Sequence, residues 1–184
     1  MPVTAALPEG VLLRPLTMHS DERGCFTEIF RNEWPTGMHP VQWNLVTSEP
    51  GVLRGVHVHV HHDDYLAVAQ GTVVVGLHDM RPDSPTFGLG TTVSLNGDSL
   101  AGLVIPHGVA HGFFFPGPAL YVYAVSVYWD QADELGCQWA DPDLGIVWPV
   151  QQATLSERDA GADSFADLSS TFVPLWQQAH GTHG

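Results

Sequence analysis

The stretch that decides the fold reads Gly51-Val-Leu-Arg-Gly-Val-His57-Val-His59-Val-His-His-Asp-Asp64-Tyr-Leu-Ala-Val-Ala-Gln-Gly71. Between its glycines, His57, His59 and His61 alternate with valines. Alternation with a period of two is typical of a β-strand with two unlike faces. We therefore predict a strand with valines on one face and histidines on the other, followed by a second, apolar strand. The histidine face is the predicted functional face.

Similar β-rich runs recur on both sides of this stretch, separated by glycine and proline, at residues 11–16, 25–30, 41–47, 73–79, 90–95, 103–106 and 120–129. Many short strands at regular spacing are typical of an all-β sandwich or barrel. Residues 164–180 are expected to hold short helical pieces interrupted at Pro174. The chain length favours one domain over residues 1–184, with a barrel core at about 40–130 on which the N-terminal strands and the C-terminal helical segment pack.

Composition excludes several classes of function. The formal net charge of -14 argues against a nucleic-acid partner. All six basic residues are arginines, so lysine Schiff-base chemistry and a phosphate-binding P-loop are both excluded. Cys25 and Cys137 have no metal or redox spacing and are expected to be free thiols. No signal peptide or membrane-spanning run is recognised, so we expect a cytoplasmic protein without a membrane partner.

Histidines and one acid recur at a spacing that suits a metal ion. His57, His59 and Asp64 lie in the opening stretch, and His111 follows in Pro106-x-Gly108-x-x-His111. These two motifs resemble those of the cupin family, whose fold is a double-stranded jelly roll. In metal-binding cupins the four positions hold one divalent ion, and three nitrogens with one oxygen suit Fe, Mn, Ni, Cu or Zn. A histidine-lined cavity with no cofactor is the alternative, and it is the leading interpretation here.

A closer resemblance covers nearly the whole chain. The segments that carry it are Asp21-Glu-Arg-Gly-Cys-Phe-Thr-Glu28, Gln42-Trp-Asn44, Gly51-Val-Leu-Arg-Gly-Val-His57, Arg81-Pro-Asp-Ser-Pro-Thr-Phe-Gly88, Ile105-Pro-His-Gly-Val-Ala-His-Gly-Phe113, Gly136-Cys-Gln-Trp139-Ala-Asp-Pro-Asp-Leu-Gly-Ile-Val-Trp-Pro149 and Leu155-Ser-Glu-Arg-Asp159. Together they resemble the dTDP-4-dehydrorhamnose 3,5-epimerase family, cupin-type enzymes of deoxysugar nucleotide biosynthesis.

The resemblance implies a role for each matching position. His57 matches the general base, Asp159 the carboxylate that orients it, and Tyr123 the general acid on the opposite face of the sugar. Arg54 would bind the diphosphate. The full set of implied substrate-binding residues is Arg23, Phe26, Glu28, Gln42, Asn44, Arg54, His111, Tyr128 and Trp139. Arg23, Phe26 and Glu28 would reach the nucleotide across the interface of a homodimer. Without the resemblance, Tyr123 reads as a core residue and Asp159 as a helix cap.

Two positions depart from the family. His59 replaces its usual glutamine, and Asp64 replaces a lysine that would stabilise the enolate oxygen. Both changes favour metal binding, so one hypothesis is that an ion held by His57, His59, Asp64 and His111 polarises the ketone as a Lewis acid. Because a metal-bound histidine cannot also act as a free base, that hypothesis moves the base role to His61 or Glu28.

The leading functional prediction is an epimerase acting on a dTDP-4-keto-6-deoxyhexose at C3, C5 or both. The chemistry suits the residue types, because a neutral histidine can remove the proton next to a ketone near pH 7. Two alternatives stay open. One is a metal-dependent cupin dioxygenase or isomerase, and the other is a nucleotide-sugar-binding cupin without catalytic activity.

Overall fold

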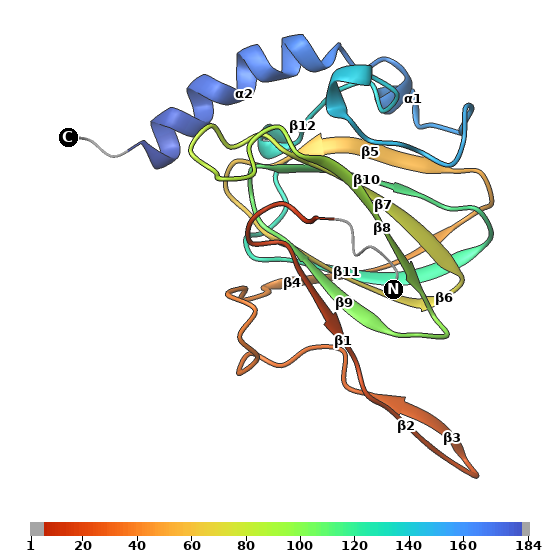
Figure 1. Ribbon diagram of the computed structural model, residues 1–184. Helices are drawn as coiled ribbons and strands as arrows, with labels where there is room; N and C mark the ends of the chain where they lie inside the picture. The colour runs from red at the N-terminus through yellow and green to blue at the C-terminus, as the bar shows by residue number, and fades with distance from the viewer. Residues whose placement is uncertain (1–5, 182–184) are drawn as a thin grey trace.

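Two antiparallel five-stranded sheets face each other in the computed structural model, which describes residues 6–181 (Figure 1). The first sheet has the order β1 (Leu12–Pro15), β9 (Ala101–Ile105), β6 (Asp64–Gln70), β11 (Ala119–Val125) and β4 (Gln42–Ser48). The second has the order β12 (Leu135–Gly136), β5 (Leu53–Val58), β10 (Val109–Phe114), β7 (Thr72–Asp79) and β8 (Gly90–Asn96). The all-β jelly roll predicted from the sequence is therefore confirmed.

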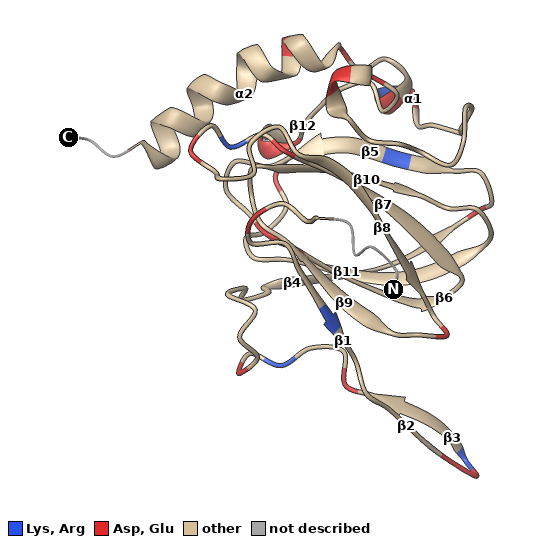
Figure 2. Ribbon diagram, in the orientation of Figure 1, with Lys and Arg blue, Asp and Glu red and all other residues tan. Residues whose placement is uncertain are grey.

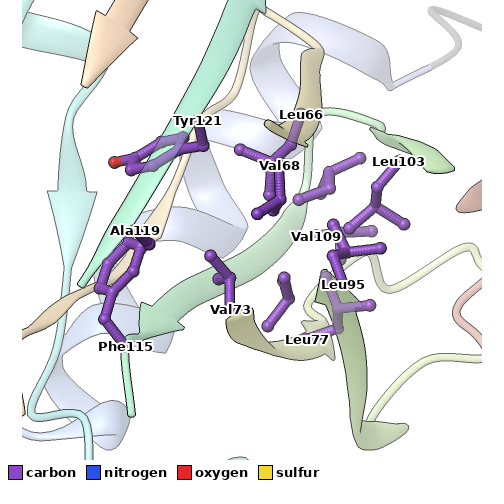
Figure 3. Close-up of a cluster of buried hydrophobic side chains, with 12 residues drawn as sticks. Leu66, Val68, Val73, Leu77, Leu95, Leu103, Val109, Phe115, Ala119 and Tyr121 are labelled. Atoms are coloured by element: carbon purple, nitrogen blue, oxygen red, sulfur yellow. The ribbon is translucent and has the colours of Figure 1, made fainter. Parts of the chain in front are cut away.

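The main hydrophobic core lies between the two sheets, where each strand turns alternate side chains inward. Figure 3 shows this cluster, with Leu66 and Leu103 from one sheet meeting Val73 and Leu77 from the other. Leu103 and Leu77 have no exposed surface at all. This core occupies one part of the space between the sheets and leaves the remainder for the cavity described below.

A C-terminal helix covers the outer face of the second sheet (Figure 1). This helix, α2 (Phe165–His180), buries Leu168, Phe172 and Trp176, and they pack against valines of β5. The expectation of short pieces interrupted at Pro174 was wrong, because one helix of 16 residues runs through it. Pro174 lies on the exposed side, where its missing N–H costs one backbone hydrogen bond while the buried face continues to hold the helix.

A hairpin formed by β2 (Met18–Asp21) and β3 (Gly24–Thr27) extends away from the two sheets (Figure 1). The strand predicted for residues 25–30 ends at Thr27, and Glu28 lies beyond it in an ion pair with Arg31 of 2.6 Å. The strand predicted for residues 120–129 likewise ends at Val125. Three short helical turns lie between β11 and α2: η1 (Gln131–Asp133) precedes β12, and η2 (Pro142–Leu144) and α1 (Glu157–Ala160) follow it.

Charged residues lie mostly at the loops and around the helices, and acidic positions outnumber basic ones (Figure 2). Both cysteines are free thiols, Cys25 exposed and Cys137 buried. Within residues 6–181, α2 and the shorter helices fall short of the length and apolar character needed to span a bilayer.

Candidate active site

A cavity of about 630 Å³ opens between the two sheets and receives side chains from both of them. Strands β4, β5, β6, β10 and β11 contribute, together with the segments around η1 and α1. Its polar lining residues are Arg54, His57, His59, His62, Asp64, His111, Tyr121, Tyr123, Glu134, Thr154, Ser156, Arg158 and Asp159. The histidine face of the opening stretch therefore does line a cavity, as predicted.

The alternation of the opening stretch holds for its first part only. Val56 and Val58 pack beneath α2, while His57 and His59 line the cavity on the other side. Strand β5 ends at Val58, but the alternation continues through His59 in the cavity lining and Val60 beneath α2, and it breaks at His61. His61 is consequently exposed, and His62 lines the cavity in its place. The prediction that three alternating histidines share one face was thus wrong at His61.

His57 and Asp159 form a close pair despite lying 102 residues apart, with 2.8 Å between Nε2 and Oδ1. Asp159 lies in α1, which is capped by Ser156. Its second oxygen accepts the backbone N–H of Gly55 at 3.3 Å. Gly55 has a φ of +111°, and a Cβ there would meet Gly112 of β10 at 2.8 Å. A glycine is therefore required where the backbone approaches both β10 and Asp159.

This pair fixes which nitrogen of His57 can accept a proton. A carboxylate only accepts, so Nε2 carries the hydrogen and Nδ1 has the lone pair, which faces Arg158 Nη2 at 3.3 Å. Burial raises the pKa of Asp159, but the hydrogen bond and charge of His57, with further donors, outweigh it and lower that pKa to about 2. Asp159 is therefore ionised throughout the neutral range and can stabilise an imidazolium at His57.

Two further residues beside His57 were missed by the sequence analysis. The Arg158 Nη1 donates to Glu134 Oε2 at 2.9 Å, and the same guanidinium lies 2.7 Å from His57 Nε2. Since that Nε2 already donates to Asp159, the ring atom that can accept from Arg158 is Nδ1, at 3.3 Å from Nη2, and Arg158 has to release this lone pair before His57 can act as a base. Arg158 directly precedes Asp159 in the sequence, which was the available signal. Nothing in the sequence around Glu134 indicated a position beside His57, because contacts with distant parts of the chain determine where η1 and the residues after it lie.

Tyr123 reaches the cavity from the opposite wall. It lies on β11 of the first sheet, whereas His57 lies on β5 of the second. Burial raises the pKa of Tyr123, and the negative charges of Asp64 and Glu134 raise it further. Its hydroxyl is consequently protonated at neutral pH and available as a donor. A base on one wall and an acid on the other is an arrangement that can exchange a proton between two faces of a bound molecule.

The predicted substrate-binding residues divide into two groups. Arg54 and His111 line the cavity, and Arg54 donates from Nε to Ser48 Oγ at 3.0 Å. Gln42 and Asn44 lie on the same face of β4 as a cavity-lining valine but outside the lining, and Gln42 Nε2 donates to Asn44 Oδ1 at 3.1 Å. Asn44 Nδ2 is buried with no partner among the described residues.

The other predicted binding residues lie apart from the cavity within this chain. Arg23 and Phe26 are exposed on the β2–β3 hairpin, and Glu28 follows that hairpin. Tyr128 is exposed beside η1. Trp139 packs with the residues under α2, and its carbonyl accepts Trp148 Nε1 at 2.9 Å, which gives Trp139 a packing role.

Residues able to hold a metal gather deeper in the cavity. His59, His62 and Asp64 place ligand atoms within 4.8 Å of one another, and His111 lies beside them. His57, which the metal hypothesis included, is instead engaged by Asp159. Burial lowers the pKa of His59 and of His111 to about 3, and burial raises that of Asp64 to about 7. Burial also opposes ionisation of His62, but its hydrogen bond to Asp133 and nearby carboxylates raise its pKa overall.

A two-sheet jelly roll with a histidine–carboxylate pair facing a tyrosine across one cavity defines a cupin-type protein equipped for proton transfer. Comparison with known proteins narrows that class. The family model described as dTDP-4-dehydrorhamnose 3,5-epimerase matches residues 5–167. The chain belongs to this epimerase family.

Named relatives agree with that assignment. A dTDP-4-dehydrorhamnose 3,5-epimerase of Neisseria gonorrhoeae is 37% identical over 177 residues, which are 92% of this chain and 54% of that protein. The chain thus spans about half the length of this relative. The Shigella flexneri protein of the same name is 33% identical, over 90% of this chain and 96% of its own length.

A solved structure of a related enzyme also matches most of this chain. It is a 3,5-epimerase from Legionella pneumophila Philadelphia 1 in complex with dTDP-4-keto-L-rhamnose, with a TM-score of 0.81 and 31% identity. The match covers 89% of this chain and 94% of that one. These relatives support the epimerase interpretation and give no support to the metal-dependent dioxygenase or to the non-catalytic alternative.

Proposed function

We propose that this chain is an isomerase that inverts a dTDP-4-keto-6-deoxyhexose at a carbon next to its ketone. The observation that carries the proposal is the cavity in which the His57–Asp159 pair and Tyr123 face each other from opposite sheets. The names of the relatives and the sugar nucleotide bound to the Legionella enzyme support this substrate class.

The geometry accounts for each proton. His57 Nδ1 removes the proton from the carbon next to the ketone, and the electrons of that C–H bond move into the carbonyl to give an enolate. Asp159 stabilises the imidazolium through the bond at Nε2. Tyr123 then delivers its phenolic proton to the opposite face of the same carbon while the enolate returns to the ketone. One proton leaves and one arrives, so nothing is oxidised or reduced.

Arg54 is the proposed diphosphate ligand. It lines the cavity from β5, close in sequence to the base, and its guanidinium is permanently charged. Its Nη1 makes no hydrogen bond with residues 6–181, whereas Nε and Nη2 are held by Ser48 and Thr47. These two bonds orient the guanidinium and leave donors for a phosphate, which arginine can bind bidentately.

The remaining predicted binding residues fit a homodimer, which we propose as the working form. β4 is an edge strand, and its outer face exposes Trp43 and the 70% accessible Leu45. An edge strand with large apolar side chains favours pairing with another chain. In such a dimer the β2–β3 hairpin can bring Arg23 and Phe26 to the partner's cavity. Light scattering after gel filtration tests this, and a monomer at micromolar concentration would contradict it.

We further propose that residues 1–184 act as one domain and that the protein works in the cytoplasm. The C-terminal helix supports the first point, because it packs on the barrel through shared buried residues. The two free cysteines support the second, since reducing compartments keep thiols unpaired. Limited proteolysis tests the domain proposal, and fractionation of cells that produce the protein tests the location.

Incubation with dTDP-4-keto-6-deoxyglucose in deuterated water tests the proposed activity. Deuterium at C3 alone indicates inversion of one centre, and deuterium at C3 and C5 indicates inversion of both. A His57→Gln variant serves as the control for exchange caused by the buffer. Absence of enzyme-dependent exchange, with the substrate bound, would contradict the proposal.

A further inference from the structure

Three histidines and one aspartate converge at the inner end of the cavity, and we refer to His59, His62, Asp64 and His111 as the inner cluster. Asp64 Oδ2 lies 3.7 Å from His59 Nε2, 3.8 Å from His62 Nε2 and 3.7 Å from His111 Nε2. These distances exceed those of hydrogen bonds. One carboxylate oxygen thus faces three ring nitrogens at nearly equal distances without bonding to any of them.

The other nitrogen of each histidine is already bonded to an oxygen. His59 Nδ1 donates to the carbonyl of Asp133 at 3.1 Å, and His111 Nδ1 donates to the carbonyl of Val109 at 3.1 Å. His62 Nδ1 donates to the carboxylate of Asp133 at 3.0 Å. Because an oxygen acceptor fixes the hydrogen on Nδ1, each neutral ring presents its Nε2 lone pair to the centre of the inner cluster.

The carboxylate at the centre has an unmet bonding requirement. Asp64 is only 7% exposed, and its Oδ2 has no hydrogen-bond partner in the part of the chain that is described. A buried carboxylate oxygen facing three lone pairs is a costly arrangement unless a positive charge lies among them. The geometry suits such a charge, since tetrahedral ions with bonds of about 2.0–2.2 Å separate their ligands by about 3.4 Å. The three distances from Asp64 Oδ2 to the ring nitrogens exceed this separation by only a few tenths of an ångström, and the ligand atoms of His59, His62 and Asp64 all lie within 4.8 Å of one another.

We propose that the inner cluster binds one divalent transition-metal ion through three imidazole nitrogens and one carboxylate oxygen. This donor set suits Zn²⁺ or Fe²⁺. It differs from the set predicted from the sequence, because His62 replaces His57. The change removes the conflict between metal ligand and base: His57 is held by Asp159 and stays available for proton transfer.

The bound ion has a chemical use in the proposed reaction, and this part of the inference rests on the proposed function. Proton removal puts negative charge on the ketone oxygen, and a preorganised positive charge there lowers the barrier. The chain has no lysine to supply it. Arg54 is bonded to the β4 backbone and Ser48, and Arg158 is paired with Glu134. An ion at the inner cluster, in the same cavity as His57 and Tyr123, supplies that charge.

Metal titration of the chelator-stripped full chain, purified without a histidine tag, tests the binding. We expect one Zn²⁺ per chain by calorimetry, and one Co²⁺ with the visible absorption of a nitrogen- and oxygen-ligated ion. His62→Gln and Asp64→Asn should each weaken the Zn²⁺ affinity by at least about 100-fold, beyond the effect typical of outer-shell residues. His61→Gln is the matched control, because that neighbouring side chain is exposed, and it should leave the affinity unchanged.

Comparison with His57→Gln decides between the two possible ligand sets. We expect this variant to keep its metal affinity while losing proton exchange. Loss of metal in His57→Gln with retention in His62→Gln would overturn the proposed set, as would the failure of the wild-type chain to bind a stoichiometric ion. Circular dichroism of each variant identifies any that fails to fold. Asp133→Asn then provides an independent test, because it alters the acceptor of His62 Nδ1 and of the His61 backbone N–H without removing a proposed ligand, and it should weaken the Zn²⁺ affinity by about 10- to 100-fold.

Deuterium exchange by the metal-stripped and the Zn²⁺-reloaded enzyme tests the catalytic role of the ion separately from the proposed function. Exchange that falls on stripping and returns with Zn²⁺ supports the role. Equal exchange in both forms would overturn the role while leaving the proposed function intact. No exchange in either form, despite one bound ion, would contradict the proposed function and leave the metal site standing.

Discussion

Replacing Asp159 with asparagine isolates the electrostatic part of the His57–Asp159 pair. The amide oxygen can still accept from Nε2, so the ring orientation is retained while the negative charge is lost. Hydrogen bonds to charged groups contribute about 1.5–3 kcal/mol. Because about 1.4 kcal/mol corresponds to a tenfold change in rate, the 2.8 Å bond predicts a decrease in kcat of about 10- to 150-fold. KM should change little, since the bond stabilises the imidazolium that forms after substrate binds.

The assay is the steady-state rate of deuterium incorporation from solvent into the sugar, measured for both single variants and the double variant. Residues that act as a unit are not additive. Asp159→Asn should therefore have almost no effect in a His57→Ala background. An equal decrease in both backgrounds would refute the assigned role, because Asp159 would then act independently of the histidine.

A second histidine–aspartate pair provides the control for that experiment. His107 Nδ1 and Asp63 Oδ1 lie 2.6 Å apart, and neither residue lines the cavity. His107→Gln disrupts this pair while leaving Asp159 and His57 in place. We expect kcat to be unchanged, which shows that loss of such a pair elsewhere in the barrel does not slow catalysis.

Three further predictions concern the acid, the pH dependence of stability and the core. Tyr123→Phe removes the proposed donor and should lower inversion by about 10²–10⁴-fold, with deuterium exchange at the original configuration retained, as judged by NMR of the product. The pKa of Asp159 is lowered from 3.8 to about 2, so its ionised form stabilises the fold above about pH 4 and this stabilisation is lost as the pH falls toward 2. Urea unfolding of the wild type and of Asp159→Asn at successive pH values measures the effect. The difference in their free energies of unfolding should shrink between about pH 4 and pH 2. Leu103→Ala should lower the free energy of unfolding by about 2–5 kcal/mol, because this side chain is fully buried between the sheets.

Two sources allowed parts of the site to be predicted from the sequence. One is the regular alternation of a β-strand, and the other is the resemblance to the epimerase family. Alternation placed Val56 and Val58 opposite His57 correctly, because all three residues lie within the one strand β5. The resemblance brought Asp159 beside His57 from the far end of the chain. Residue spacing alone could not have done this, since nothing local links α1 to β5.

The parts that could not be predicted depend on distant contacts with an irregular segment. After Val58 the chain is shaped by Asp133, whose carboxylate accepts the backbone N–H of Val60 and of His61 at 2.8 and 3.2 Å. It also accepts from His62, so one side chain more than 70 residues away turns this histidine inward. Periodicity describes a strand, and these residues do not form one. His61 was therefore predicted to face the site where His62 does.

The change of chain direction after β5 also separates the proposed base, His57, from the proposed metal ligands. A strand continued through residue 61 would place His57, His59 and His61 in one row. Instead, the chain leaves β5 at Val58, and Asp133 directs His62 toward Asp64 and His59. His57 remains on the strand, where Gly55 allows Asp159 to approach. The base and three of the four inner-cluster residues thus come from one short stretch, with His111 added from β10, and no residue is shared between the proposed proton transfer and the proposed metal binding.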